Sequence, residues 1–428
     1  MFILVHSFRL RGPKNTRDDQ GQTRDNSPSQ NAGAAGRPML SYFSLKFVLR
    51  SLEALCLVLA TLSPNSIREV ASQALASAQT TSFAFTAAGD YGFSDDAAAT
   101  LRKIGAAAAV FNLALGDMSY SHSRPESEWC QFVKDNLNAG AGRPAGGPFG
   151  ESFPFQLITG NHENEPILED GYIDNYAACL PDRMNSVISP YGEYAREYYF
   201  DYQNARFILV GADNADGIDP YDYAVGSNHY NWLRDRIVEA RDAGRWVIVG
   251  MHKVCVTMGV KSCEIGSDLM NLLIAERVDL VLQGHEHNYQ RSKQLTCATA
   301  GSFESACVVD DGADGTYIRG AGTVFVIVGT GGADLYDVST ADAEAGYFAR
   351  WIGLNVTPRK GMLKVTVSDA SLSAQFVGST TGSFTDFFTI GDPDPTPTRE
   401  GIAGGAFKMF LQQFKVYLPV ILKAWEAR

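Results

Sequence analysis

The sequence has no excess of positive charge. Lys and Arg number 36 against 48 Asp and Glu. Residues 1–78 carry nine Lys/Arg and five Asp/Glu, which leaves a formal charge of −16 on the rest of the chain. An acidic body lacks the basic footprint of a general nucleic-acid-binding protein, so no nucleic-acid partner is expected. It would also repel a phosphate ester unless something local supplied positive charge.

The seven cysteines include no C-x-x-C pair, which argues against a zinc ribbon. Cys56 lies in an apolar run, and the other six are widely spaced. An even number at such spacing suits three disulfides made in an oxidising compartment. Pairing of sequence neighbours predicts Cys130–Cys179, Cys255–Cys263 and Cys297–Cys307, although spacing alone leaves the other connectivities open. Six buried thiols in a cytosolic protein are the alternative.

An apolar run near the N-terminus is too short for a membrane span but suits an export signal. Lys46 and Arg50 precede the run at 52–62, and Ala76–Ala78 follows as a small-x-small cleavage site. This order is typical of a secretory signal peptide. We therefore interpret residues 1–78 as a disordered extension plus a signal peptide, and expect the protein to be secreted or held at the cell surface. An amphipathic N-terminal helix is the alternative.

Short apolar strands alternate with helical patterns through residues 80–391. The predicted strands are 82–88, 110–115, 155–159, 246–250, 278–282 and 323–328, and the predicted helices are 95–108, 126–138, 229–242 and 267–277. Continuous apolar strands separated by helices indicate sheets that are covered on both faces, in an α/β catalytic domain. Residues 194–211 predict a hairpin that turns near Gln203 and Asn204, and strands follow at 361–367 and 372–378.

The C-terminal segment differs in composition from the body. Residues 392–400 are rich in proline and are interpreted as an extended linker. Within 401–428, apolar side chains from Phe407 to Trp425 fall on one helical face, and Pro419 would kink a helix there. We interpret this amphipathic tail as a contact with the cell surface or a membrane interface. A helix packed on the catalytic body is the alternative.

Five of the predicted strands run into loops that contain possible metal ligands. These side chains are Asp90, Asp117, Tyr120, Asn161, His162, His252, His285 and His287. Loops at the carboxyl ends of strands converge on one crevice in layered α/β folds. Carboxylate, phenolate and imidazole groups suit ions such as ferric iron, zinc or manganese. A glycine before each loop's first ligand lets the backbone turn sharply and approach closely. One such loop occurs by chance in many proteins, whereas five in order indicate a metal site.

The five loops resemble the motifs of the purple acid phosphatases, which are binuclear metallophosphoesterases. The motifs GDxG, GDxxY, GNH(D/E), VxxH and GHxH correspond to Gly89–Gly92, Gly116–Tyr120, Gly160–Glu163, Val249–His252 and Gly284–His287. The wider superfamily usually opens with DxH and lacks the tyrosine, so the first two motifs point to the purple branch. The similarity covers about residues 82–390 and extends to Tyr289, Arg291 and the turn Gly329–Gly332. It implies a four-layer α/β/β/α sandwich of two mixed sheets flanked by helices.

The resemblance also implies two metal ions. Ferric iron would be bound by Asp90, Asp117, Tyr120 and His287. A divalent zinc, iron or manganese ion would be bound by Asp117, Asn161, His252 and His285, so that Asp117 bridges the pair. A metal-bridging hydroxide would then attack the phosphorus of a phosphate ester. His162 would contact the phosphate or protonate the leaving group, with a hydrogen bond that supports a ligand as the alternative.

One departure from the family concerns the substrate. Plant enzymes of this family carry further histidines in the loop after VxxH, whereas residues 253–283 contain none. Lys253 and Lys261 are candidates for positive charge there, and a Cys255–Cys263 disulfide would close the loop. The expected activity is an acid phosphatase that hydrolyses a small phosphate monoester. Phosphodiesterase or phytase-like activity, and a surface-anchored binding protein with a degenerate site, are the alternatives.

Overall fold

The computed structural model describes residues 82–164, 171–184, 191–212 and 221–392. These residues belong to a unit that spans Gln79–Arg428. The predicted extension and signal peptide, the linker beyond residue 392 and the C-terminal tail lie outside the described residues.

A seven-stranded mixed sheet carries the first three motif loops. Its strand order is β12-β17-β16-β15-β1-β2-β3. Strands β1 (Phe83–Ala88), β2 (Asn112–Leu115) and β3 (Phe155–Ile158) are parallel, so their carboxyl ends lie at one edge. The remaining strands are β12 (Thr316–Ile318), β15 (Gly361–Val367), β16 (Ser371–Gly378) and β17 (Phe387–Gly391). Strand β15 continues the sheet antiparallel to β1.

An eight-stranded mixed sheet carries the other two motif loops. Its order is β14-β9-β13-β8-β7-β6-β5-β4. The bounds are β4 (Gly192–Glu193), β5 (Glu197–Tyr202), β6 (Ala205–Val210), β7 (Trp246–Gly250), β8 (Leu280–Gln283), β9 (Tyr289–Ser292), β13 (Val324–Val328) and β14 (Phe348–Ile352). Strands β6, β7, β8 and β13 are parallel. The predicted hairpin is β5–β6, in which Tyr202 pairs with Ala205 around the two-residue turn. A separate pair is formed by β10 (Gln294–Leu295) and β11 (Val308–Asp310).

The alternation of side chains along β7 shows how the layers are built. Trp246 and Ile248 belong to a core that also contains Phe85 and Leu113 of the first sheet, so this core lies between the two sheets. Val247 and Val249 face the opposite way and belong to a second core. That core is completed by α8 (Asn228–Asp242) and α9 (Ser267–Ala275), which supply Leu233, Ile237, Leu269 and Leu273. The continuous apolar strands of the sequence are therefore strands buried on both faces.

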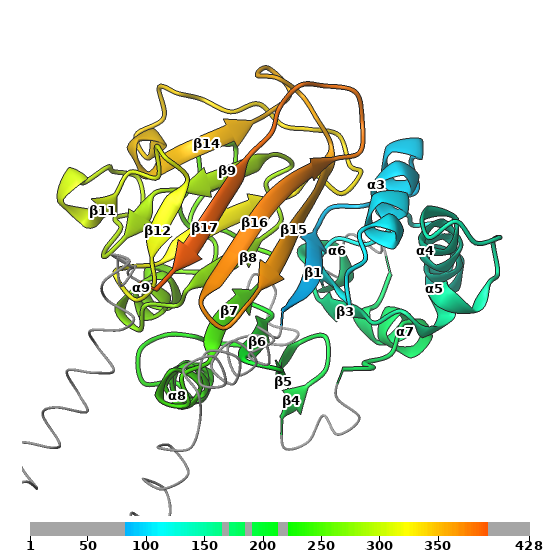
Figure 1. Cartoon of the computed structure of the whole chain (residues 1–428), viewed down its shortest axis with the longest axis horizontal. Coiled ribbons are helices and arrows are strands. Elements are labelled where there is room, and N and C mark those ends of the chain that lie inside the picture. The colour runs from blue at the N-terminus through cyan, green and yellow to red at the C-terminus, as the bar shows by residue number, and fades with distance from the viewer. Residues whose placement is uncertain (1–81, 165–170, 185–190, 213–220, 393–428) are drawn as a thin grey trace, which may run out of the picture. The chain divides into compact units, whose positions relative to one another are not determined.

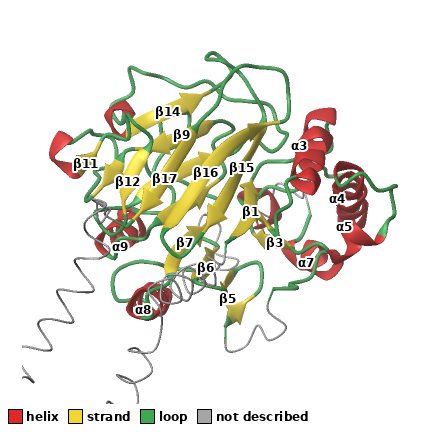
Figure 2. Ribbon diagram, viewed as in Figure 1, coloured by secondary structure: helices red, strands yellow, loops and turns green. Residues whose placement is uncertain are grey.

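Helices also cover β1, β2 and β3 on the side away from the second sheet. They include α3 (Asp95–Ala106), α4 (Glu126–Gly140), α5 (Pro148–Ser152) and α7 (Ile173–Cys179), which lie together in Figure 1. Short helical turns occur at α6 (Asn161–Asn164), η1 (Ser305–Cys307) and η2 (Ala345–Tyr347). Figure 2 shows the two sheets with helices on their outer sides. The predicted α/β/β/α arrangement is confirmed, and each strand or helix predicted between residues 82 and 391 is present within a few residues of its expected bounds.

Three disulfides join the cysteines that were predicted to pair. They are Cys130–Cys179, Cys255–Cys263 and Cys297–Cys307. Three disulfides in one domain are consistent with an extracellular protein. Among the described residues, none of the helices combines the length and apolar character needed to cross a bilayer.

A buried ion pair joins the two sheets away from the motif loops. Arg291 on β9 donates to both carboxylate oxygens of Asp386 at 2.7 and 3.0 Å, and the Tyr289 hydroxyl donates to the same carboxylate at 2.7 Å. Asp386 is 5% exposed and directly precedes β17 of the other sheet. Tyr289 and Arg291, to which the family resemblance extends, therefore hold the two sheets together through Asp386.

Replacing Asp386 by Asn is expected to lower the free energy of unfolding by about 3–5 kcal/mol, because the guanidinium of Arg291 stays buried without its counter-charge. Urea denaturation of the two proteins measures the loss. Asp235→Asn is the control, since Asp235 pairs with Arg234 at the surface, where an ion pair contributes about 0–1 kcal/mol. An unchanged denaturation midpoint for Asp386→Asn would show that this pair does not stabilise the fold.

Candidate metal centre

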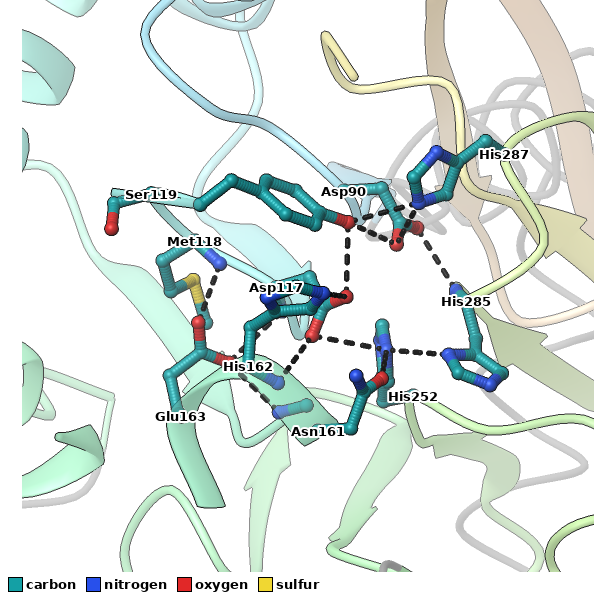
Figure 3. A network of polar contacts seen from close by, with 12 residues as sticks. Asp90, Asp117, Met118, Ser119, Asn161, His162, Glu163, His252, His285 and His287 are labelled. Atoms are coloured by element: carbon teal, nitrogen blue, oxygen red, sulfur yellow. Dashed lines mark hydrogen bonds and ion pairs between the residues drawn. The ribbon is translucent and has the colours of Figure 1, made fainter. Parts of the chain in front are cut away.

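The five motif loops meet at the carboxyl ends of strands from both sheets. Asp90, Asp117 and Asn161 follow β1, β2 and β3, while His252 and His285 follow β7 and β8. Backbone hydrogen bonds connect neighbouring loops: Asp90 N–H donates to Gly116 O at 3.1 Å, and Gly284 N–H donates to His252 O at 2.9 Å. Figure 3 shows the predicted side chains turned toward one another around Asp117. The structure thus brings together the residues that the sequence placed on separate loops.

One group of ligand atoms surrounds the hydroxyl of Tyr120. This oxygen lies 2.9 Å from Asp90 Oδ1, 2.9 Å from Asp117 Oδ2 and 3.0 Å from His287 Nε2. His287 Nε2 is 3.4 Å from Asp90 Oδ1. Atoms bound at right angles about 2.1 Å from one ion are about 3.0 Å apart, so these spacings suit ligands of a single cation. Within the described part of the chain, the two carboxylates and His287 form one of two clusters able to hold a metal ion.

A second group lies on the other side of Asp117. His252 Nε2 is 3.2 Å from Asp117 Oδ1, 3.1 Å from Asn161 Oδ1 and 3.1 Å from His285 Nδ1. Asp117, His252 and His285 form the other cluster able to hold a metal ion. Asp117 therefore presents Oδ2 to one group and Oδ1 to the other, which is the arrangement of a carboxylate shared between two ions.

Each of the three histidines predicted as ligands has one ring nitrogen that faces away from the ligand groups and contacts a hydrogen-bond acceptor. His252 Nδ1 lies 2.7 Å from Leu115 O, and His287 Nδ1 lies 2.8 Å from Asp334 O. His285 Nε2 lies 3.1 Å from Glu264 Oε2. An outward acceptor holds the proton on that nitrogen and leaves the other nitrogen free to bind a metal. All three rings are therefore set for coordination.

Four of the predicted ligands have a left-handed backbone. The φ angles are +62° for Asp90, +53° for Asp117, +50° for Tyr120 and +68° for His285. This region is uncommon for residues other than glycine, and such strain, of order 1–3 kcal/mol per residue, concentrates at functional sites. The predicted need for glycine is also borne out. A Cβ on Gly116 would lie 2.5 Å from His252 Nδ1, and one on Gly160 would overlap Asp117 Oδ1.

Glu163 connects the second and third motif loops through hydrogen bonds to their backbone. Its carboxylate accepts backbone N–H groups of Asp117 at 3.0 Å, Met118 at 2.7 Å and Gly160 at 3.0 Å. Burial and the neighbouring charge of Asp117 raise the pKa of Glu163 to about 7. These three bonds fix the backbone of the loops that carry Asp117 and Asn161.

The pKa shifts in the site arise from burial and from the charge of the Asp117 carboxylate. Burial opposes ionisation of Asp117, but the charge of His252 outweighs it and holds the pKa of Asp117 well below its usual range. Burial likewise opposes protonation of His252, yet Asp117 raises its pKa to about 10. Burial, followed by Asp117 and Asp90, raises the pKa of the Tyr120 phenol well above 10. A bound cation would supply the same compensation and favour phenolate at Tyr120.

His162 lies beside the ligands and is more open than they are. Its backbone N–H donates to Asp117 Oδ1 at 3.1 Å, its Nε2 lies 3.8 Å from Asp117 Oδ2, and its ring centroid is 4.4 Å from that of Tyr120. Its side chain is 23% exposed, compared with 2% for His252. The ring can therefore reach a molecule that enters the site.

Two neighbours of the ligands were missed by motif reasoning. Tyr336 stacks on the ring of His287 with centroids 4.0 Å apart, and the Lys261 ammonium lies 5.9 Å from the Tyr336 ring. Glu264 accepts from His285 and pairs with Lys253 at 3.3 Å. The hydrogen bond with His285 is the main cause that lowers the pKa of Glu264 to about 2. The sequence marked this loop as unusual through its missing histidines, its lysines and its cysteine pair, but none of these features indicated a role for Glu264.

Comparisons with known proteins agree with this geometry. The calcineurin-like phosphoesterase family profile matches residues 83–289, a segment that contains all five motif loops. An uncharacterized protein of Mycobacterium tuberculosis is 29% identical over 249 residues, which are 53% of this chain and 42% of that protein. The chain thus spans about two fifths of this relative's length.

Other relatives carry functional names. A nucleotide pyrophosphatase/phosphodiesterase of barley, Hordeum vulgare, is 26% identical over 64% of this chain and 70% of its own length. Purple acid phosphatase 22 of Arabidopsis thaliana is 27% identical over 49% of this chain and 45% of its own length, and another Arabidopsis relative is named a probable inactive purple acid phosphatase.

A solved structure of a purple acid phosphatase from yellow lupin seeds has the same fold. It superposes with a TM-score of 0.53 at 19% identity, over 73% of this chain and 54% of the lupin chain. The predicted resemblance is therefore confirmed. The chain belongs to the calcineurin-like metallophosphoesterases, with named relatives among the purple acid phosphatases and a buried Asp/His cluster of the binuclear kind typical of the family.

Proposed function

We propose that this protein is an exported acid phosphatase that hydrolyses small phosphate monoesters at a binuclear centre. The observation that carries the proposal is the shared carboxylate of Asp117. Its two oxygens face two separate ligand groups, and one of those groups includes the hydroxyl of Tyr120. A tyrosine in this position is what separates the purple branch from the wider superfamily in the motif comparison above.

The chemistry of the two groups supports different ions. The first group consists of Asp90, Asp117, Tyr120 and His287, and its three oxygen ligands suit ferric iron. The second consists of Asp117, Asn161, His252 and His285, and its two imidazoles suit divalent zinc, iron or manganese. When bound, such a pair of cations neutralises a phosphate group and acidifies water. This would provide the local positive charge that the acidic body otherwise lacks.

We assign the leaving-group end of the reaction to His162. The ring lies beside Asp117 and Tyr120 but is not enclosed as the three ligand histidines are. From there, Nε2 can donate a hydrogen bond to a phosphate oxygen or a proton to the leaving oxygen. Asp117 would hold both ions, and the backbone N–H of His162 donates to Asp117 Oδ1, which connects the two residues.

A comparison of two substrates tests the proposal. Metal-loaded protein is expected to hydrolyse p-nitrophenyl phosphate with a kcat/KM at least about tenfold higher than that for bis-p-nitrophenyl phosphate, with an acidic optimum. The reverse ratio would favour a phosphodiesterase, a second candidate that the barley relative supports. No turnover of either substrate by protein that holds two ions would favour a binding protein with a degenerate site, in line with the relative named inactive.

Colour offers an independent test at Tyr120. Iron-loaded protein is expected to be violet or pink, because a phenolate ligand gives charge transfer to ferric iron. Tyr120→Phe should abolish this visible band, while iron content measured by mass spectrometry falls less than the absorbance. Tyr336→Phe is the control, since Tyr336 stacks on His287 without joining the ligand group. Colour that survives Tyr120→Phe would mean that the iron ligand is wrongly assigned.

We also propose export, with the cleavage site near Ala78 and Gln79. The three disulfides support an oxidising compartment. The segment after residue 400 would then serve as a contact with the cell surface or a membrane interface. N-terminal sequencing of protein recovered from outside the cytoplasm, together with release of a chain truncated at 400, tests both points.

A further inference from the structure

The loop between β7 and α9 is closed by a disulfide and by a backbone hydrogen bond next to it. The Cys255–Cys263 disulfide joins the two sides of the loop. Immediately beyond it, Glu264 N–H donates to Val254 O at 3.0 Å. The residue that follows the disulfide is therefore held by a covalent link and a backbone hydrogen bond. The backbone position of Glu264 is therefore fixed relative to Val254.

The side chain of Glu264 reaches the metal centre. Glu264 Oε2 lies 3.1 Å from His285 Nε2, the ring nitrogen that faces away from the ligand cluster. The same oxygen is 3.3 Å from the ammonium of Lys253, whose side chain is 4% exposed. The lysine compensates the carboxylate, so Glu264 can sit beside a phosphate-binding site without adding a net negative charge to it.

The tip of the loop is bound in return by the last motif. Glu286, which lies between His285 and His287, accepts the backbone N–H of Lys261. Glu286 is fully buried, and Asn288 Nδ2 donates to it at 3.3 Å. The loop and the last motif are thus in contact at two points. Glu264 contacts His285, and the backbone N–H of Lys261 donates to Glu286.

His285 differs from the other two histidines in what holds its ring. His252 and His287 have backbone carbonyl oxygens as outward partners, whereas the outward partner of His285 is the Glu264 side chain. A backbone carbonyl is retained under substitution, but a carboxylate can be removed. One of the two ligand groups therefore depends on a side chain from a disulfide-closed loop.

We propose that Glu264 is a positioning residue for the ion held by Asp117, Asn161, His252 and His285, and that the Cys255–Cys263 loop keeps it in place. By accepting from Nε2–H, it fixes the tautomer in which His285 Nδ1 faces the ion. This inference rests on the proposed binuclear function. It adds that the affinity for this ion depends on the Cys255–Cys263 loop, whereas the affinity for the other ion does not.

The test is a calorimetric titration of metal-depleted protein with Zn²⁺. The unmodified protein is expected to bind two ions per chain. Glu264→Ala and Glu264→Met, which retains the side-chain length, should lower the affinity for one of the two ions about 10–100-fold and leave the affinity for the other unchanged. Glu264→Gln retains an acceptor oxygen and should stay within a few-fold of the unmodified protein. In iron-loaded Glu264→Ala, the colour that arises at Tyr120 should persist.

The disulfide is tested with a matched pair of double variants. C255S/C263S should lower the affinity for the same ion. C297S/C307S opens a loop of similar length beside β10 and β11 and should leave that affinity unchanged. Melting temperatures confirm first that each variant is folded. Wild-type affinity for both ions in Glu264→Ala and Glu264→Met, or equal weakening of both ions, would overturn the inference. Fewer than two ions in the unmodified protein would instead overturn the proposed function itself.

Discussion

Asp117→Asn should remove both metal ions and reduce phosphatase activity about 10⁴-fold. A neutral amide cannot serve two cations at once, and both ligand groups include Asp117. Loss of a supporting hydrogen-bond partner costs about 10–100-fold in metal affinity, so loss of a shared ligand should cost at least about 100-fold at each of the two sites. Metal analysis after gel filtration, together with turnover of p-nitrophenyl phosphate, measures the two effects.

Asp279→Asn is the matched control for this substitution. Asp279 is also buried and accepts a backbone hydrogen bond, from Val247 N–H at 2.9 Å, but it lies at the opposite ends of β7 and β8 from the metal centre. Burial raises its pKa to about 6, so a neutral amide replaces a group that is partly protonated in mild acid. Asp279→Asn should retain two ions and full activity. Two ions in Asp117→Asn as well would mean that this residue does not bridge them.

His162→Ala should lower kcat by about 10²–10⁴-fold while both metal ions remain bound. The loss should depend on the leaving group. An alkyl phosphate needs a proton on its departing oxygen, whereas p-nitrophenolate leaves readily without one. We therefore expect a larger reduction with glycerol phosphate than with p-nitrophenyl phosphate, measured as kcat for both substrates under saturating conditions.

The control for His162 is His122→Ala. His122 follows the second motif but is exposed, and its removal should change kcat less than tenfold. If His162 only supports a ligand through hydrogen bonding, its removal would lower the metal content and affect both substrates equally. That result would assign protonation of the leaving group to water or to another residue.

The loop after His252 is where this chain departs from the plant purple acid phosphatases that it resembles. The loop after His252 has no histidine, and it carries the disulfide Cys255–Cys263 with lysines on either side of Cys255. Lys253 is committed to Glu264, and Lys261 lies near the ring of Tyr336. Lys261 is therefore the lysine of the two that is better placed to meet a substrate, while Lys253 balances the carboxylate that positions His285.

The sequence by itself determined the layers of the fold and the loops in which the candidate metal ligands lie. Apolar runs of four to seven residues with helical patterns between them can be satisfied only by sheets covered on both sides, so the elements were predictable from local patterns. The candidate ligands were predictable because each lies in a loop that follows a strand, and the carboxyl ends of parallel strands share an edge. Neighbour pairing of the cysteines was also correct. Cys255–Cys263 and Cys297–Cys307 each close a short local stretch, and Cys130–Cys179 joins α4 to α7.

Only the tertiary structure decided which atoms face each other. The family resemblance extends to Tyr289 and Arg291 without giving them a role, and the structure shows that both contact Asp386 at the junction of the sheets. The division of Asp117 between two ligand groups and the contact of Glu264 with His285 also depend on loops from both sheets meeting at one place. Such contacts join residues far apart in the chain, and their geometry is set by how the layers pack rather than by any local pattern.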